Sequence, residues 1–447
     1  EVSNPGAVRI RLRSLKAAMD RRENSATSRE IKSEVCKRPL FTKEMRKNQY
    51  TILAPQMAPI HFELVREAAL SEGYNMKILE TADRNDIEEG LRYVNNDTCY
   101  PAIIVIGQII KALKSGEYDP GKTAVIISQT GGPCRASNYL ALLKKALDAA
   151  GFNNIPIISL NVAGLEKSPG FKLTLPLVKK AIMGMIYGDL LMRVLYRTRP
   201  YEENKGEAEK IFNKWMEKCK SDLYSASRRV FRENLFNIVS DFEGISITDE
   251  IKPRVGLVGE ILVKYHPTAN NNMVRFIENS GAEMVVPDLT DFFLYCAFGR
   301  EMDWRYLSGS NIQRMLGNLF ISIVEGYRND MRDALRNSKR FGLPKTIREL
   351  SESVSHILSL CNHTGEGWLL TAEMVDLIES GANNIICMQP FACLPNHITG
   401  RGMIKKLKDL YPHANIVAVD YDPGASEVNQ INRIRLMLEK AKGNLAI

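Results

Sequence analysis

Short apolar runs alternate with helix-like patterns along the chain from Tyr50 onward. This alternation is typical of parallel strand and helix units. Eight runs have the length of buried strands, at residues 50–53, 76–79, 123–128, 155–160, 254–263, 282–286, 384–388 and 415–419. The pattern therefore predicts an α/β chain with two strand-and-helix halves.

The apolar segment after Pro101 resembles a strand over residues 102–106. Its apolar pattern continues to Leu113 and stops at Gly116, and proline is well tolerated at the first position of a helix. We therefore expect a buried helix here. Three further stretches have helical patterns, at residues 165–246, 288–360 and 427–442.

These patterns suggest four regions. We expect a basic helical arm and linker at 1–47, a first α/β domain at 48–164, a helical connector at 165–250, and a second α/β domain at 251–447 with a helical insertion at about 288–360. The arm is rich in arginine and lysine and carries little apolar material. We expect it to pack on a neighbouring domain.

The length, composition and net charge narrow the class of protein. A chain of 447 residues is too long for one core, and its 45% hydrophobic and 25% charged residues are ordinary for a globular protein. No apolar run or leader pattern predicts a membrane span or a signal peptide. The net charge of +8 comes without an aromatic-interleaved basic patch, so we expect no nucleic-acid partner. The chain begins at Glu1, which fits a processed chain, an expression product or one piece of a longer polypeptide.

Three of the eight cysteines lie in polar, turn-forming loops, at residues 95–101, 129–135 and 389–397. So few cysteines suggest a reducing cytoplasm rather than a disulfide scaffold. Cys134 and Cys393 each follow a predicted strand, and loops at the carboxyl ends of parallel strands converge on a ligand-binding crevice. We therefore expect Cys99, Cys134 and Cys393 to meet in a folded cleft.

Helix starts just after Cys99 and Cys134 would favour thiolate over thiol. The separations of 35 and 259 positions match neither a zinc ribbon nor a compact ferredoxin run. Three interpretations stay open from the residues: a cubane iron–sulfur cluster with three thiolates and one open iron, buried cysteines without a metal, and zinc with His397 as fourth ligand.

Other residues allow both a functional and a structural role. Arg135 could hold an anionic ligand or balance the charge of a cluster, or it could be solvated. His397 could act as an acid or hydrogen-bond donor, or it could cap local backbone. Cys361 is a weaker candidate for a fourth ligand, and Cys387 is expected in the core. Glu260 and Lys264 are weak candidates for cleft contacts, and the other cysteines are background, Cys36, Cys219 and Cys296.

The three loops, NNDTCYPA, SQTGGPCRASNY and CMQPFACLPNHITG, resemble one family, together with VGEILVKYHPTANN at Val258 and VDYDPGASEVNQINR at Val419. This is the 2-hydroxyacyl-CoA dehydratase and benzoyl-CoA reductase superfamily. More narrowly, the chain is similar to the C-terminal region of the large activase-related proteins. The resemblance covers nearly everything from about residue 38 onward.

The resemblance implies two Rossmann-like or flavodoxin-like domains with an oxygen-sensitive 4Fe-4S cluster in the cleft between them, held by Cys99, Cys134 and Cys393. An ATPase activator domain or protein would supply single electrons, and the open iron would receive an acyl-CoA or another small molecule. A homodimer with a linked double-cubane 8Fe-9S cluster is a related form. The chain has no GxxxxGK[ST] loop and no recognisable nucleotide site. A non-catalytic docking or electron-relay module of a larger activase is the alternative.

Overall fold

The computed structural model describes residues 12–13, 15–17, 19–20, 38–79, 83–95, 97–129, 134–161 and 168–445. The chain divides into two compact units, residues 1–38 and 39–447. Most of the predicted basic arm lies outside the described residues. The second unit contains both predicted sheets and the three cysteines.

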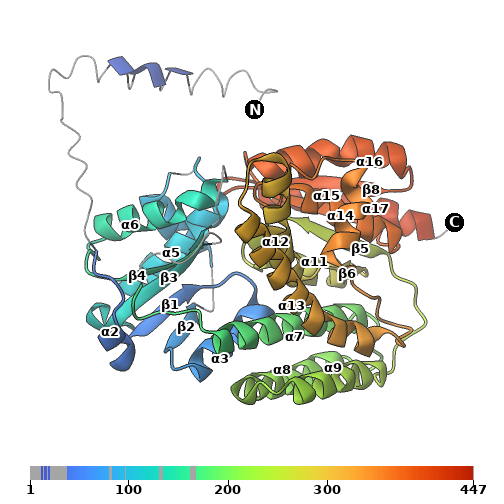
Figure 1. Ribbon diagram of the computed structural model, residues 1–447. Coiled ribbons are helices and arrows are strands. Elements are labelled where there is room, and N and C mark those ends of the chain that lie inside the picture. Colours follow the sequence, from blue (N-terminus) through green and yellow to red (C-terminus); the bar gives the residue numbers. More distant parts are fainter. Residues whose placement is uncertain are drawn as a thin grey trace. The chain divides into compact units, whose positions relative to one another are not determined.

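Each half of the second unit contains one four-stranded parallel sheet (Figure 1). The first sheet has the order β2-β1-β3-β4 and the second the order β6-β5-β7-β8. The strands are β1 (Thr51–Pro55), β2 (Met76–Leu79), β3 (Thr123–Gln129), β4 (Ile157–Asn161), β5 (Arg254–Gly259), β6 (Glu283–Val285), β7 (Asn384–Pro390) and β8 (Asn415–Tyr421). The predicted α/β class is confirmed, and the arrangement is consistent with two Rossmann-like or flavodoxin-like domains.

In both sheets the order in which the chain adds strands reverses at the centre. After β1 the chain adds β2 on one side and then β3 on the other, and β5, β6 and β7 repeat this order in the second half. In such sheets ligands bind beyond the carboxyl ends of the two central strands. The loops after β1 and β3, and after β5 and β7, are therefore the expected ligand-binding positions.

Helices cover both sheets and form a layer of their own (Figure 1). Those of the first half are α2 (Lys43–Lys47), α3 (Pro59–Ser71), α4 (Arg84–Tyr93), α5 (Tyr100–Lys114) and α6 (Tyr139–Ala149). The connector contains α7 (Leu175–Thr198), α8 (Glu207–Ser225) and α9 (Arg228–Glu243). The second half contains α10 (Ile261–Tyr265), α11 (Met273–Asn279), α12 (Leu289–Tyr306), α13 (Asn311–Leu335), α14 (Ile347–Ser355), α15 (Gly367–Glu379), α16 (Ile404–Leu410) and α17 (Glu427–Leu445).

Three local expectations need correction. The strand expected over 254–263 ends at Gly259, whose φ of +151° breaks the extended path before α10 begins. Residues 168–174 are not helical, so the helical pattern does not extend through the whole of 165–246. The polar helix α4 was not predicted, because only Asp86 and Gly90 of its residues are buried and few of its residues are apolar. The buried helix after Pro101 is confirmed as α5.

Helix α5 is buried on nearly every side and connects the two halves. Its apolar residues belong to one continuous core that includes Leu53 and Val125 of the first sheet and Val255 and Leu257 of the second. Gln108 of α5 also lies 3.4 Å from His266 of the second half, measured between Nε2 atoms. The two sheets therefore share a core.

A buried polar network fixes the connector against both halves. Asp189 of α7 accepts hydrogen bonds from the backbone amides of Leu289 (2.7 Å) and Thr290 (3.3 Å) at the start of α12. His61 of α3 lies 2.8 Å from the same carboxylate. Because these groups are buried, one aspartate ties together the first half, the connector and the second half.

Helices α4 and α5 cross at two glycines. A Cβ atom on Gly107 would lie 1.8 Å from the carbonyl oxygen of Asp86, and one on Gly90 would lie 2.1 Å from that of Ile103. We expect Gly107→Ala to lower the free energy of unfolding by about 1 to 3 kcal/mol, because the helices must separate. Chemical denaturation would measure this.

Gly326, inside α13, offers the matched control, since nothing lies within 4 Å of the position that an added methyl group would occupy. We expect Gly326→Ala to be neutral or stabilising by up to about 1 kcal/mol through helix propensity. Equal effects of the two substitutions would contradict the close crossing.

Candidate functional site

Cys99 lies at the start of α5, as the residue that precedes its first turn. The half-buried Sγ atom is 3.3 Å from the hydroxyl of Tyr139, which begins α6. Pro101 follows within the first turn, so the local sequence places the cysteine at the N-terminus of a buried helix.

Cys134 lies after β3 and immediately before the short helix Arg135–Asn138. Its Sγ atom is 3.8 Å from the position that a Cβ atom on Gly365 would occupy. Gly365 has a φ of +60°, and the same position is 2.7 Å from Pro395. A side chain there would be strained and crowded, so the glycine allows two loops of the second half to approach the cysteine.

Cys393 lies in the loop after β7, where Ala392 has a left-handed φ of +56°. Such a conformation is unusual for a residue other than glycine and occurs often at functional sites. The amide of Cys393 donates to the carbonyl of Pro390 at 3.1 Å. Asn396 lies one turn later, and its side-chain amide donates to the Cys393 Sγ atom at 3.4 Å.

Two glutamates lie among the cysteines. Glu260 directly follows β5, and its Oε2 atom accepts the amide of Val263 at 2.9 Å. Glu366 directly precedes α15; its Oε1 atom accepts the amide of Ile261 at 3.2 Å, and its Oε2 atom accepts Asn396 at 3.3 Å. Glu366 therefore links the turn after β5 to the loop of Cys393.

The pKa shifts show how close these groups are. Burial raises the pKa of Glu260 to about 8, and the charge of Glu366 adds to the effect. Burial, with smaller contributions from the charges of Glu260 and Cys134, raises the pKa of the Cys99 thiol to about 12. Burial also raises the pKa of Cys393, with the charges of Glu366 and Glu260 acting in the same direction. The structure thus brings all three cysteines around the two glutamates.

The expectation that a helix start favours a thiolate was wrong for the metal-free protein at Cys99, and Cys393, for which no such expectation was made, behaves in the same way. Hydrogen bonds from nearby backbone amides lower both pKa values, but burial raises them more. At these two positions the loss of hydration destabilises the thiolate more than the nearby backbone amides stabilise it. Both side chains are therefore protonated at neutral pH in the absence of a bound cation.

Several buried polar atoms beside the cysteines have no hydrogen-bond partner within the described part of the chain. They include the hydroxyl of Tyr295 and the Oδ1 atom of Asn396. The charges of Glu366 and Cys134 both raise the pKa of Tyr295, after the larger effect of burial, so its ring lies beside the site. Unsatisfied buried groups of this kind are costly, and they are compatible with a bound group that would complete them.

The arrangement does not form a site for a single ion. Among the described residues, no three histidine, cysteine, aspartate or glutamate side chains are placed to bind one metal ion together. Each thiolate of a cubane binds a different iron, so a cluster needs cysteines that surround a volume. The described side chains therefore form no preformed single-ion site, with or without His397.

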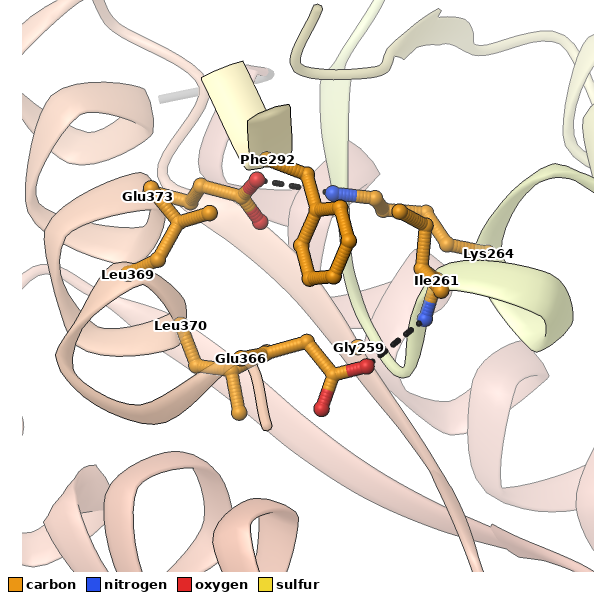
Figure 2. Close-up of a pocket in the computed structure, with 8 residues that line it drawn as sticks. All are labelled: Gly259, Ile261, Lys264, Phe292, Glu366, Leu369, Leu370 and Glu373. Carbon is orange, nitrogen blue, oxygen red and sulfur yellow. Dashed lines mark hydrogen bonds and ion pairs between the residues drawn. The ribbon is translucent and has the colours of Figure 1, made fainter. Parts of the chain in front are cut away.

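A narrow pocket lies next to the cysteine site (Figure 2). Phe292, Leu369 and Leu370 contribute apolar walls, and Lys264 and Glu373 form a buried ion pair of 2.7 Å across it. The space is too narrow for a water molecule. Lys264 is thus held by Glu373, and the pocket packs the site from one side instead of admitting a substrate.

Arg135 and His397 occupy different surroundings. The guanidinium of Arg135 donates to the carbonyls of Asp97 and Thr98, so it ties the Cys134 loop to the Cys99 loop. His397 lies in the π-helical turn after Cys393 and donates its backbone amide to the Cys393 carbonyl. Its Nδ1 atom is buried and has no partner in the described residues.

The remaining cysteines lie apart from the loop ends. Cys387 is buried within β7, and Cys219 is buried in α8. Cys361 is exposed, and Cys296 is partly buried in α12 near Glu366, whose charge, after burial, raises its pKa. Cys36 lies outside the described residues.

No protein-family model matches the sequence, and a search of curated proteins finds no match. The resemblance to the dehydratase superfamily therefore stays a prediction from the cysteine loops. A bilayer-spanning helix is absent from the described residues, since no helix there combines sufficient length with sufficient apolar character.

Sequence reasoning missed several residues of the site. Glu366, Tyr139 and Tyr295 were not selected, because each approaches the cysteines only through the tertiary fold. Asn396 was not selected either, although it lies only three positions after Cys393. A weak signal existed for Glu366, which lies between two glycines directly before an apolar helix. That pattern is typical of a tight turn that delivers a side chain to the start of a helix.

Titration of Glu260 should affect the stability of the metal-free protein. The folded state holds this proton more tightly than the unfolded chain, where the ordinary value is 4.5. Its contribution is therefore complete below pH 4.5 and is lost as the pH rises toward 8. We expect the free energy of unfolding to fall across this range by on the order of 2 kcal/mol more in the wild type than in Glu260→Gln. Urea denaturation at a series of pH values would measure this. The same pH dependence of the free energy of unfolding in both proteins would contradict the prediction.

Alkylation should separate buried from exposed cysteines. With a pKa of about 12, the Cys99 thiol is only about 0.01% thiolate at pH 8. We expect iodoacetamide to modify the exposed Cys361 first and Cys99 at least tenfold more slowly in the metal-free protein, as followed by peptide mass spectrometry. Equal rates would show that Cys99 is exposed or activated.

Proposed function

We propose that this chain is an iron–sulfur protein of the 2-hydroxyacyl-CoA dehydratase type, with a 4Fe-4S cluster bound by Cys99, Cys134 and Cys393. The observation that carries the proposal is the convergence of three cysteines from distant loops at the carboxyl ends of two parallel sheets. Two of these loops follow β3 and β7, which are central strands at the positions where such sheets bind ligands.

The residues fit this cofactor. Thiols are the ligands that iron–sulfur clusters use, and Cys99 and Cys393 both lie close enough to Glu260 for its charge to raise their pKa. Tyr139 and Asn396 lie within hydrogen-bonding distance of Cys99 and Cys393, and hydrogen bonds to cysteine sulfur tune the reduction potential of a cluster. Cluster binding would release the thiol protons, so uptake should be favoured at higher pH.

When bound, such a cluster would supply low-potential single electrons and one iron accessible to a small ligand. The chain's own residues would set the surroundings. The three cysteines are partly buried, and Arg135 holds two of the cysteine loops together. Glu260, with a pKa of about 8, would keep a proton on its carboxyl group beside the sulfurs at neutral pH.

Two related roles share this site. The chain could work as a docking or electron-relay module of a larger ATP-dependent activase, or as a reductase with a linked double-cubane cluster. An acyl-CoA or another small molecule would be the substrate of an enzyme, and an ATPase activator would be the electron donor. All of these roles fit a cytoplasmic, oxygen-sensitive protein.

Metal analysis after anaerobic purification tests the proposal. We expect a brown protein with about four irons and four sulfides per chain; a linked form shared by two chains would hold about eight irons and nine sulfides per dimer. Cys99→Ala, Cys134→Ala and Cys393→Ala should each lose most of this iron. Cys361→Ala, which removes an exposed cysteine outside the cleft, is the control and should keep it.

A colourless wild-type protein that folds normally in air and holds no iron would overturn the proposal. Bound zinc that depends on His397 would favour a structural zinc site. To separate the two redox roles, turnover should be compared with binding to the activator: Cys99→Ala would abolish the turnover of an enzyme, whereas a docking module would keep its affinity.

A further inference from the structure

The two halves repeat one another around the cysteine site. Both sheets have the same strand order, and each has a buried helix directly before its third strand: α5 before β3, and α15 before β7. Cys99 is the residue before the first turn of α5, and Glu366 is the residue before the first turn of α15. Glu366 therefore occupies the position in the second half that Cys99 occupies in the first.

The loops after the third strands repeat as well. Cys134 follows β3 and Cys393 follows β7. In each case a polar side chain about one turn later reaches back to the helix start: Tyr139 contacts Cys99, and Asn396 contacts Glu366. The site thus has two matching pairs, Cys99 with Cys134 and Glu366 with Cys393.

From this repeat we propose that Glu366 is the fourth protein ligand of the metal centre held by the three cysteines. The inference rests on the proposed function. Carboxylate oxygen is a common ligand of protein-bound iron. Each oxygen of Glu366 accepts one hydrogen bond and keeps lone-pair capacity for another interaction. Binding forms one iron–oxygen bond, and any proton on the carboxyl group leaves to solvent.

This ligand would change how the site is used. The fourth iron would be closed by Glu366 in the resting protein, and a small molecule would reach it only by displacing the carboxylate. The side chain is pinned by Ile261 and Asn396, which come from the turn after β5 and the Cys393 loop. Movement of either loop would therefore open the iron.

The test uses anaerobically loaded protein, mild ferricyanide oxidation and electron paramagnetic resonance of the resulting three-iron cluster. We expect Glu366→Gln to lose its fourth iron at least tenfold faster than the wild type. Glu366→Cys, which supplies a fourth thiolate, should lose it more slowly than the wild type. Glu379→Gln is the control, a carboxyl group at the other end of α15 that pairs with Lys345 on the surface, and should behave like the wild type.

Equal rates of iron loss for the wild type, Glu366→Gln and Glu366→Cys would overturn the ligand assignment and leave the cluster proposal intact. A wild-type protein without any cluster would overturn both. Iron and sulfide content and circular dichroism of each variant distinguish a lost ligand from a misfolded chain.

A second inference comes from an independent feature, the outer face of α13. Five of its residues are large, apolar and 45% to 69% exposed: Ile312, Met315, Leu316, Leu319 and Ile323. Their spacing of three and four residues places them on one stripe of the helix. Leu307, in the turn before α13, is 62% exposed and extends the stripe. Contiguous exposed apolar side chains of this kind mark interaction sites.

The exposed positions of this stretch carry no charge. Between Asn311 and Ile323, the other exposed residues are Asn311, Gln313 and Ser322. Arg314 is turned aside, with its guanidinium 3.7 Å from the ring of Trp304. Arg305, 53% exposed between Trp304 and Tyr306, is a charge beside the stripe. A partner that placed a charge opposite the stripe itself would bury it unpaired. A second copy of the same uncharged stripe has no such cost.

We propose that α13 pairs with α13 of a second copy of this chain around a twofold axis. The stripe, with the nearby rings of Trp304 and Tyr306, presents an apolar area on the order of 500 Å². A standard interface buries about 800 Å² per partner, of which about 57% is apolar. The face therefore has nearly the apolar area that such an interface needs, and twofold pairing is the commonest assembly of identical chains.

Sedimentation velocity over a concentration series tests this pairing. We expect a dimer for the wild type and a monomer for the double variant Leu316→Glu, Leu319→Glu, with unchanged melting of the monomer fold. Leu436→Glu is the matched control, because Leu436 is 74% exposed on α17 between charged residues. It should leave the dimer intact.

A wild-type protein that stays monomeric throughout would overturn the proposal, as would a dimer that the double variant does not weaken. Flotation of the monomeric wild type with neutral lipid vesicles would assign the face to a membrane surface instead.

Discussion

The position of the two sheets depends on one buried carboxylate. Asp189 lies on α7, accepts two backbone amides at the start of α12, and meets His61 of α3. Gly188 leaves no room for a side chain there, since a Cβ atom would be 2.4 Å from the His61 ring. Removal of one member of a buried network of this kind typically costs about 3 to 5 kcal/mol, because its partners stay buried and unpaired. Through these contacts the connector sets the distance between the loops that carry the cysteines.

The predictable part of this protein was local. Short apolar runs identified all eight strands of the described part of the chain, and the turn chemistry around Cys134 and Cys393 placed both at the carboxyl ends of strands. The wrong boundary predicted for 254–263 has a physical cause, since Ile261 to Val263 continue the apolar run after the chain has turned at Gly259. Apolar character alone cannot distinguish the end of a buried strand from the start of a buried helix.

The unpredictable part was tertiary. The sequence shows helix starts beside two cysteines, but the balance between a helix terminus and burial is decided by groups distant in the chain, such as Glu260 beside Cys99. Glu366 is 267 positions from Cys99, and the correspondence between them becomes visible only when the strand orders of both sheets are known. Local patterns predict which residues lie in a loop, whereas the protonation state and the neighbours of those residues follow from the tertiary fold.

The division of the site between two halves also sets an order on biosynthesis. Cys99 and Cys134 leave the ribosome early, whereas Cys393 follows roughly 260 residues later, a delay of about 13 to 50 s at ordinary elongation rates. The first sheet can form in that interval, but its core is completed by residues of the second sheet. Two thiols would meanwhile be exposed to the cell without their partners. The nascent chain is thus most vulnerable to oxidation and to binding of the wrong metal before β7 has emerged, and a protein that shields this intermediate would protect the yield of the finished site.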